Sequence, residues 1–131
     1  MKNESQRQKR VAEQVKQIVA RGFYTSNLAG TDLATRITIT KVNISKDLKH
    51  GQVFYTLLGG YIAEEDIVQT TDILNTNTPD INTFVAKNMA TKYTPKLRFF
   101  YDHAFEEANR VERLLDEVVP EPNSERGSGT G

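Results

Sequence analysis

The sequence predicts an α+β fold in which three strands and four helices form one two-layer domain. A chain of 131 residues has the length of a single domain. Leu, Ile, Val and Phe make up 33 of these residues, which is enough apolar side chain for a buried core. The apolar spacing alternates between the helical and the strand period, in the order α-β-β-α-α-β-α.

Residues 6–21 are predicted to form an amphipathic helix that ends at Gly22. Apolar side chains recur every three or four residues, which places them on one face of a helix. A glycine directly after the last turn is typical of a helix C-terminus. The positions predicted to be buried are Val11, Val15, Ile18 and Val19.

Two antiparallel strands are predicted to follow, over residues 36–44 and 53–58. The first is rich in β-branched residues and alternates between two faces, but the alternation changes phase in the middle of the strand. One extra residue, a β-bulge near Thr40 or Lys41, would return the apolar side chains to one face. The polar residues 45–49 turn the chain between the two strands.

Two helices are predicted next. The first covers residues 64–74 and has acidic residues in its first turn, where they suit the helix dipole. The second begins with Thr78 as its N-cap and Pro79 as its first residue. The side chains expected to face the core are Ile67, Val68, Thr71 and Leu74 in the first helix and Ile81, Phe84, Val85 and Met89 in the second.

The C-terminal part is predicted to contain a third strand, over residues 96–101, and a helix over residues 103–119 with Asp102 as its N-cap. Residues 120–131 are polar and rich in Gly and Ser, so we expect a disordered tail after a domain that spans residues 1–119. The apolar stripe of the helix consists of Ala104, Ala108, Val111, Leu115 and Val118.

The order α-β-β-α-α-β, here with an additional C-terminal helix, is that of the type II KH fold, a nucleic-acid-binding architecture. The G-x-x-G loop with which KH domains approach a nucleic-acid backbone is absent between the two central helices. Single-strand binding in the usual KH manner is therefore not expected, and the fold alone does not establish a function.

The formal net charge of zero conceals an asymmetry. Residues 1–101 carry a net charge of +5, and residues 102–131 carry −5. A basic body with an acidic C-terminal end suits a polyanionic partner, whereas the overall balance would not; the alternative is a set of solvated surfaces whose charges segregate without a binding role.

The sequence offers no catalytic or metal site. It has no cysteine, no Walker loop and no G-x-G-x-x-G after a strand. His50 and His103 lie at a predicted turn and a predicted helix start, which are not the positions of an oriented catalytic base. No apolar run is long enough to span a membrane, and residues 1–10 lack the apolar region of a secretory signal.

Basic and aromatic residues interleave near the third strand, a pattern that can hold unpaired bases by stacking. Leu97, Phe99 and Tyr101 are expected to form the core face of that strand. Tyr93 lies in the preceding loop and is therefore the better candidate for stacking.

Three segments together resemble the ribosome-binding factor A family. The first is RVAEQVK at 10–16, and the second runs from Ile37 through SKDLKH at 45–50 to Gly59. The third is YTPKLRFFYD at 93–102, continued by RVERLL at 110–115. They occur in the order of the family and cover most of residues 7–117.

The resemblance implies a cytoplasmic bacterial assembly factor with a type II KH fold. Such a factor binds the immature small (30S) ribosomal subunit and its 16S rRNA and supports late maturation. It is not an enzyme, uses no cofactor or metal, and is released with help from a ribosome-associated GTPase. We expect a monomer that contacts no membrane. The family has an Ala-x-Gly kink between its central helices, where this chain has Asn77-Thr78-Pro79.

Resemblance and charge together predict the RNA-binding residues, with phosphate contacts made by the cations. A KH-like protein with a non-ribosomal RNA target and a protein-interaction module that uses the acidic C-terminal helix are the alternatives. The predicted residues are Arg7, Lys9, Arg10, Lys16, Lys41, Lys46, Lys49, Lys87, Lys92, Tyr93 and Lys96.

Overall fold

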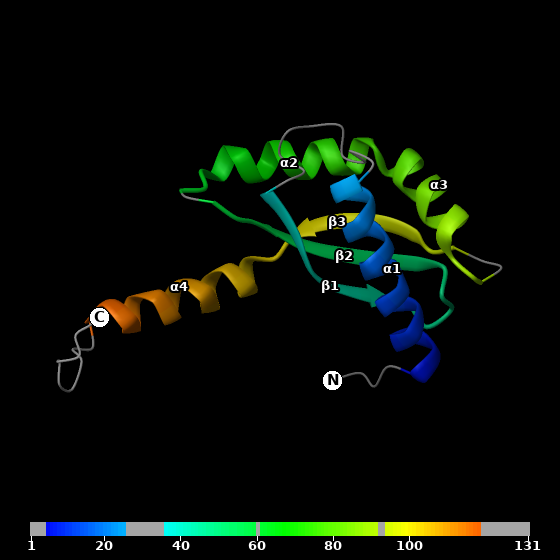
Figure 1. Cartoon of the computed structure of the whole chain (residues 1–131), viewed down its shortest axis with the longest axis horizontal. Coiled ribbons are helices and arrows are strands. Elements are labelled where there is room, and N and C mark those ends of the chain that lie inside the picture. Colours follow the sequence, from blue (N-terminus) through cyan, green and yellow to red (C-terminus); the bar gives the residue numbers. More distant parts are fainter. Residues whose placement is uncertain (1–4, 26–35, 60, 92–93, 119–131) are drawn as a thin grey trace.

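The computed structural model has the element order that the sequence predicts (Figure 1). It describes residues 5–25, 36–59, 61–91 and 94–118, without the side chains of 24–25 and 111–118; the predicted tail lies outside the described residues. The elements are α1 (Gln6–Thr25), β1 (Ile37–Ile44), β2 (His50–Leu57), α2 (Glu64–Thr76), α3 (Thr78–Asn88), β3 (Lys96–Tyr101) and α4 (His103–Val118).

The three strands form one sheet in the order β1-β2-β3. β1 and β2 are antiparallel, as predicted, and β2 and β3 are parallel. The register of β1 shifts between Ile39 and Lys41, so the predicted β-bulge is confirmed. The bulge brings Ile39, Val42 and Ile44 to the same side of the sheet, where all three are buried.

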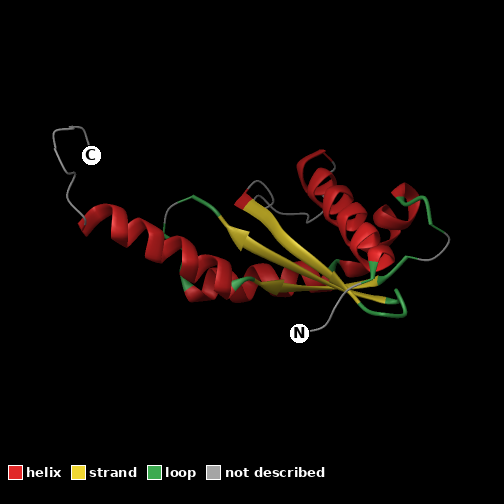
Figure 2. Ribbon diagram, turned by 90° about the horizontal axis from the view of Figure 1, so that it is seen from below, coloured by secondary structure: helices red, strands yellow, loops and turns green. Residues whose placement is uncertain are grey.

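Helices α1, α2 and α3 pack against one side of the sheet, which we call the inner face. Their apolar side chains and those of alternate strand residues form a single core cluster. The predicted stripe of α1 is buried in full. None of the described helices lies along the other side, the open face (Figure 2).

α1 is longer than predicted, and the prediction that it ends at Gly22 is wrong. The helix continues through Gly22 to Thr25. Phe23 is only 4% exposed, and its ring lies 6.1 Å from that of Phe99 in β3. Burial of a phenyl ring is worth more than the roughly 1 kcal/mol that glycine costs inside a helix, so the helix persists for another turn.

α2 buries a different set of side chains from the predicted one. Val68 is 52% exposed, whereas Thr70 is fully buried together with Ile67 and Leu74. These three residues are spaced by three and four, which gives one continuous face. Thr71 is half-buried, and its hydroxyl lies 2.5 Å from the hydroxyl of Tyr55 in β2.

The junction between α2 and α3 lies one residue earlier than predicted. Asn77, not Thr78, is the N-cap of α3. The Thr78 hydroxyl donates to the carbonyl of Asn75 at 2.9 Å, so it is turned back toward α2. Pro79 consequently occupies the second helical position, where the helix does not use its N–H.

Side-chain amides of α2 and α3 form hydrogen bonds with the main chain of β3, along the edge that does not pair with β2. The amide of Asn75 in α2 accepts from the N–H of Phe99 at 2.9 Å and donates to the carbonyl of the same residue at 3.1 Å. Asn82 in α3 accepts from the N–H of Leu97 at 3.3 Å. These amides fix the position of α2 and α3 along the strand.

α4 begins at the sheet and then projects away from the domain (Figures 1 and 2). Asp102 is its N-cap, as predicted, and accepts from the N–H of Phe105 at 2.9 Å. Ala104 and Ala108 of the predicted stripe are exposed, and the other members lie outside the described side chains. Of the described helices, none is long and apolar enough to cross a membrane.

Candidate nucleic-acid interface

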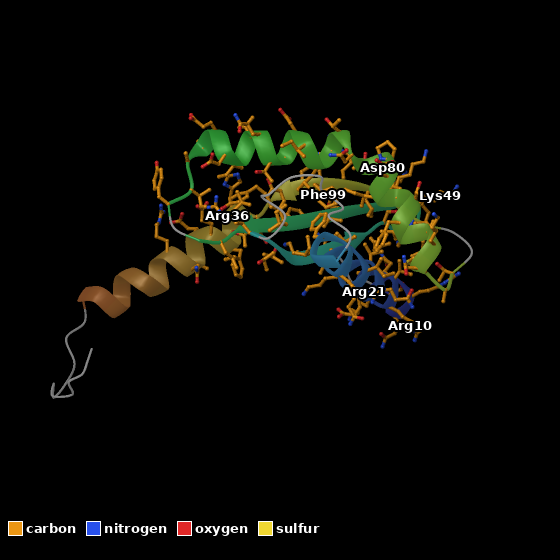
Figure 3. All side chains as sticks on the ribbon, turned by 45° about the horizontal axis from the view of Figure 1, so that its top comes forward. Arg10, Arg21, Arg36, Lys49, Asp80 and Phe99 are labelled. Carbon is orange, nitrogen blue, oxygen red and sulfur yellow. The ribbon has the colours of Figure 1, made fainter. Side chains whose placement is uncertain are left out.

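Many of the cations predicted to bind RNA gather at one end of the domain. The end consists of the start of α1, the β1–β2 turn, the end of α3 and the start of β3 (Figure 1). Figure 3 shows Arg10 and Lys49 at this end and Arg36 at the opposite end. We call this the basic end; its exposed cations are Arg7, Lys9, Arg10, Lys46, Lys49, Lys87 and Lys96.

The β1–β2 turn holds Lys46 and Lys49 in place through side-chain hydrogen bonds. Asp47 Oδ1 accepts from the Ser45 hydroxyl at 2.6 Å and from the N–H of Lys49 at 3.0 Å. The Ser45 hydroxyl also accepts from the N–H of His50 at 3.0 Å. The hydrogen bond from Ser45, followed by that from the Lys49 N–H, lowers the pKa of Asp47 below its ordinary value. These contacts extend β2 to His50, ahead of the predicted start at Val53.

Leu48 completes the turn with a positive φ of 64°, which is uncommon for a residue with a side chain. Its side chain packs against the core. The turn is therefore anchored at Leu48, while Lys46 and Lys49 on either side stay exposed.

The start of α1 is fixed by a capping box that was not predicted from the sequence. The Ser5 hydroxyl accepts from the N–H of Gln8 at 3.0 Å, and Gln8 Oε1 accepts from the N–H of Ser5 at 2.9 Å. Gln8 is 7% exposed, and its Nε2 donates to the carbonyl of Ile44 at 2.8 Å. The spacing S-x-x-Q ahead of the Val11 stripe was the available signal.

Main-chain contacts bring β3 to the same end. The N–H of Lys96 donates to the carbonyl of Lys49 at 2.8 Å, which places the start of β3 beside the last residue of the β1–β2 turn. Lys87 lies in the last turn of α3, where a cation suits the helix dipole.

The remaining predicted residues are not part of the basic end. Lys16 is half-buried further along α1, and Lys41 is exposed on the open face, with its Nζ 4.9 Å from the centre of the Phe54 ring. Lys92 and Tyr93 lie outside the described residues.

Acidic groups gather at the opposite end of the domain. Glu64, Glu65 and Asp66 form the first turn of α2, and Glu106 and Glu107 lie in α4. Two arginines at this end are engaged within the protein. Arg36 donates to the carbonyls of Leu58 and Gly59 at 2.8 and 3.0 Å, and Arg110 pairs with Glu107 at 2.6 Å. The domain is thus electrostatically polar along its length, with Asp47 in the β1–β2 turn and Asp80 at the start of α3, which Figure 3 shows near Lys49, as acidic exceptions on the basic side.

The two histidines are exposed and lie on different elements, His50 at the start of β2 and His103 at the start of α4. His103 packs its ring against Tyr101 at 4.9 Å. No group of three His, Cys, Asp or Glu residues in the described part of the chain is arranged to hold a metal ion.

Comparison with known proteins gives a consistent set of relatives. A family model described as ribosome-binding factor A matches residues 7–115. A protein of that name from Halorhodospira halophila is 34% identical over 122 residues, which cover 93% of this chain and 94% of the relative. One from Coxiella burnetii is 35% identical over 124 residues, which cover 95% of this chain and 99% of the relative.

Solved structures show the same fold. The solution structure of a Thermotoga maritima protein has a TM-score of 0.60 and 23% identity, and covers 76% of this chain and 91% of its own. The crystal structure of ribosome-binding factor A from Thermus thermophilus has a TM-score of 0.58 and 17% identity, and covers 72% of this chain and 94% of its own. A homology model of Thermus thermophilus ribosome-binding factor A, fitted into a cryo-EM map of a 30S complex, has a TM-score of 0.52 and 20% identity, and covers 70% of this chain and 91% of its own.

Proposed function

Because this chain belongs to the ribosome-binding factor A family, we propose that it binds the immature 30S subunit through its 16S rRNA and supports late maturation. A Thermus thermophilus relative has been fitted into a map of a 30S complex, which supports this assignment. The protein acts as a monomeric binding factor without catalysis, in the cytoplasm, and a ribosome-associated GTPase assists its release.

The observation that carries the proposal is the basic end. Its cations come from separate elements of the fold, and the fixed turn at Ser45–His50 holds two of them at the surface. Such an arrangement suits the phosphates of a folded RNA surface better than the bases of a single strand. The acidic opposite end is repelled by RNA, so the long-range field turns the basic end toward the subunit.

Charge removal at the basic end tests the proposal. Lys46→Ala with Lys49→Ala removes two exposed cations and leaves the hydrogen bonds of Ser45 and Asp47 in place. Binding to immature 30S subunits is measured by sucrose-gradient co-sedimentation over a range of salt concentrations. We expect weaker binding and a log–log salt slope that is flatter by roughly 1.4–1.8, since each phosphate contact contributes roughly 0.7–0.9.

A control variant changes the net charge by the same amount at the other end. Val68→Glu with Gln69→Glu places two negative charges on the exposed side of α2. We expect this variant to keep the salt slope of the parent protein. If both variants bind with the parent slope, the basic end is not the RNA-binding surface, and docking through protein contacts of α4 becomes the better explanation.

A further inference from the structure

The open face of the sheet carries an aromatic and basic cluster. Two phenyl rings, Phe54 in β2 and Phe100 in β3, lie on paired positions of adjacent strands with ring centres 5.6 Å apart. Lys41 pairs with Phe54 on the other side, and its Nζ lies over the Phe54 ring. The row Lys41–Phe54–Phe100 therefore crosses the whole sheet.

This row is separate from the core. Leu97, Phe99 and Tyr101 are buried on the inner face, as the sequence predicts for the core face of β3. Phe100 alternates along β3 with these three residues, so its half-buried ring lies on the opposite side of the sheet, which α1, α2 and α3 leave uncovered. The core does not require an aromatic ring at this position.

The polar side chains of the open face are neutral or positive. The next row toward the basic end pairs Asn43 with Gln52 and Gln52 with Arg98, and the row after it pairs His50 with Lys96. The three strands contain no Asp or Glu. Lys41, Lys96 and Arg98 are exposed and form no ion pair with any residue that the structure describes. The open face is therefore continuous with the basic end through Lys96.

Two carboxylates near this surface are hydrogen-bonded within the protein. Asp102 follows β3, and its two oxygens accept from the Thr40 hydroxyl and the Phe105 N–H, while its negative charge also attracts Lys41. Asp47 is bonded to Ser45 and the Lys49 N–H in the turn.

The residue types on the open face indicate which class of ligand it can bind. A protein interface has a core depleted in charge, whereas here exposed cations flank just two phenyl rings. Flat rings among exposed cations and amides fit a ligand with flat faces, hydrogen-bonding edges and phosphates, which is unpaired nucleic acid. A duplex keeps its bases stacked inside and cannot use the rings.

We propose that the open face binds a short unpaired RNA segment, with one base stacked on Phe100 and a second on Phe54 once the Lys41 side chain moves off that ring to a phosphate, and with further phosphates contacted by Lys96 and Arg98. This surface shares Lys96 with the basic end that carries the proposed function, but Phe54, Phe100, Lys41 and Arg98 lie outside that end, so either proposal can fail without the other. It gives the protein a second mode of contact, in which single-stranded RNA is held beside the folded RNA on the basic end.

The test uses the full chain with labelled oligouridylate and oligoadenylate of about eight nucleotides, and with a hairpin duplex of similar charge. Binding is measured by fluorescence anisotropy. We expect the single strands to bind more tightly than the duplex. Phe100→Leu keeps an apolar side chain without a π face and should weaken single-strand binding roughly tenfold, whereas Phe100→Tyr keeps the π face and should bind like the parent protein.

Phe105→Leu is the matched control, because Phe105 is an exposed phenylalanine on α4, 44% exposed and outside the sheet. It should leave binding unchanged. Thermal melts establish that each variant is folded. Since the chain has no tryptophan, Phe100→Trp supplies a single reporter whose emission should be quenched when a base stacks on it.

Three results would overturn the proposal. The first is single-strand binding no tighter than duplex binding. The second is a folded Phe100→Leu variant that binds like the parent protein. The third is a concentration-dependent dimer in sedimentation equilibrium that Phe100→Leu dissociates, because a second copy would then cover the face. Subunit co-sedimentation of the same variants, compared with Lys46→Ala/Lys49→Ala, separates failure at this face from failure at the basic end.

Discussion

The hydroxyl of Thr40 donates a 2.5 Å hydrogen bond to Oδ2 of Asp102. Thr40 is the bulged residue of β1, and Asp102 is the N-cap of α4, so the bond joins an irregularity of one strand to the first turn of the projecting helix. The N–H of Asp102 donates to the carbonyl of Tyr55 at 2.7 Å. The bulge thus has two effects. It returns the apolar side chains of β1 to the inner face, and it fixes the point at which α4 leaves the sheet.

This contact makes stability depend on pH. Burial alone would raise the pKa of Asp102, but the hydrogen bonds from Thr40 and the Phe105 N–H outweigh it, and the pKa is lowered. A carboxylate with a lowered folded-state pKa stabilises the protein above its unfolded-state pKa, and this contribution is lost as the pH falls through the folded-state pKa. The pKa of Asp47 is also lowered, so its contribution to stability is likewise lost at acidic pH.

Thr40→Val should therefore reduce the free energy of unfolding at pH 7 by about 1–2 kcal/mol, because the Asp102 carboxylate loses a donor. The difference from the parent protein should be smaller at a second, acidic pH that lies below the lowered folded-state pKa of Asp102, because the carboxyl group is then protonated. Urea unfolding followed by circular dichroism at both pH values measures this. Thr38→Val, at an exposed threonine of the same strand, is the control and should change stability by less than about 0.5 kcal/mol. An equal loss at both pH values would argue against the contact.

Gly51→Ala should destabilise the protein by about 1–3 kcal/mol through overpacking. A Cβ at this position would lie 2.8 Å from Leu97 Cδ2 and 3.1 Å from Ile44 Cδ1, both in the core. Thermal or urea unfolding gives the value. In a double-mutant cycle with Leu97→Ala, the two losses should sum to more than the loss of the double variant, because the shorter side chain leaves room for the methyl group. Strict additivity would contradict the steric explanation.

Phe23→Ala should cost about 3–5 kcal/mol, the range for removal of a buried phenyl ring. The ring contacts Phe99 only because α1 continues past Gly22. A helix that ended at Gly22 would leave Phe23 near the surface, and the same substitution would then have little effect. Unfolding by urea distinguishes the two cases, and Ala20→Ser, at an exposed position of the preceding turn, controls for changes in helix propensity.

Pro79→Ala should change the free energy of unfolding by no more than about 1 kcal/mol, because the second position of a helix has no intrahelical use for an N–H. The helical content should stay the same, since the break between α2 and α3 is held by Asn77, whose side-chain amide donates to the carbonyl of Ile73 at 2.9 Å. A clear gain of helix in the far-ultraviolet spectrum would mean that proline, and not Asn77, separates the two helices.

Local patterns predicted most of the fold. The β-bulge followed from the change of phase in β1, and β3 and the start of α4 followed from the proline before the strand and the aspartate after it. The errors have tertiary causes. From local pattern alone Gly22 is a plausible helix end, and it is the packing of Phe23 against Phe99 that extends the helix. The burial of Thr70 in place of Val68 depends on how α2 lies along β3.

The candidate site was predictable only in part. The charge asymmetry and the SKDLKH turn identified cations that do come together at one end. Their proximity depends on the parallel pairing of β2 with β3, which brings Lys96 beside Lys49 and which a one-dimensional pattern does not specify. Phe100 was included in the aromatic run of β3. Its proposed role in base stacking, however, depends on Phe54 being its neighbour across the sheet.

The double hydrogen bond between Asn75 and Phe99 also has a consequence for self-association. An outer strand with free N–H and C=O groups is a template on which another chain can add a strand, and this is a common route to aggregation. The Asn75 amide occupies both groups of Phe99, and Asn82 occupies the N–H of Leu97. On the other outer strand, Gln8 takes the carbonyl of Ile44. The apolar strands KLRFFY and ITITKVNI are thereby kept from intermolecular β-pairing at these positions as long as α1, α2 and α3 stay docked.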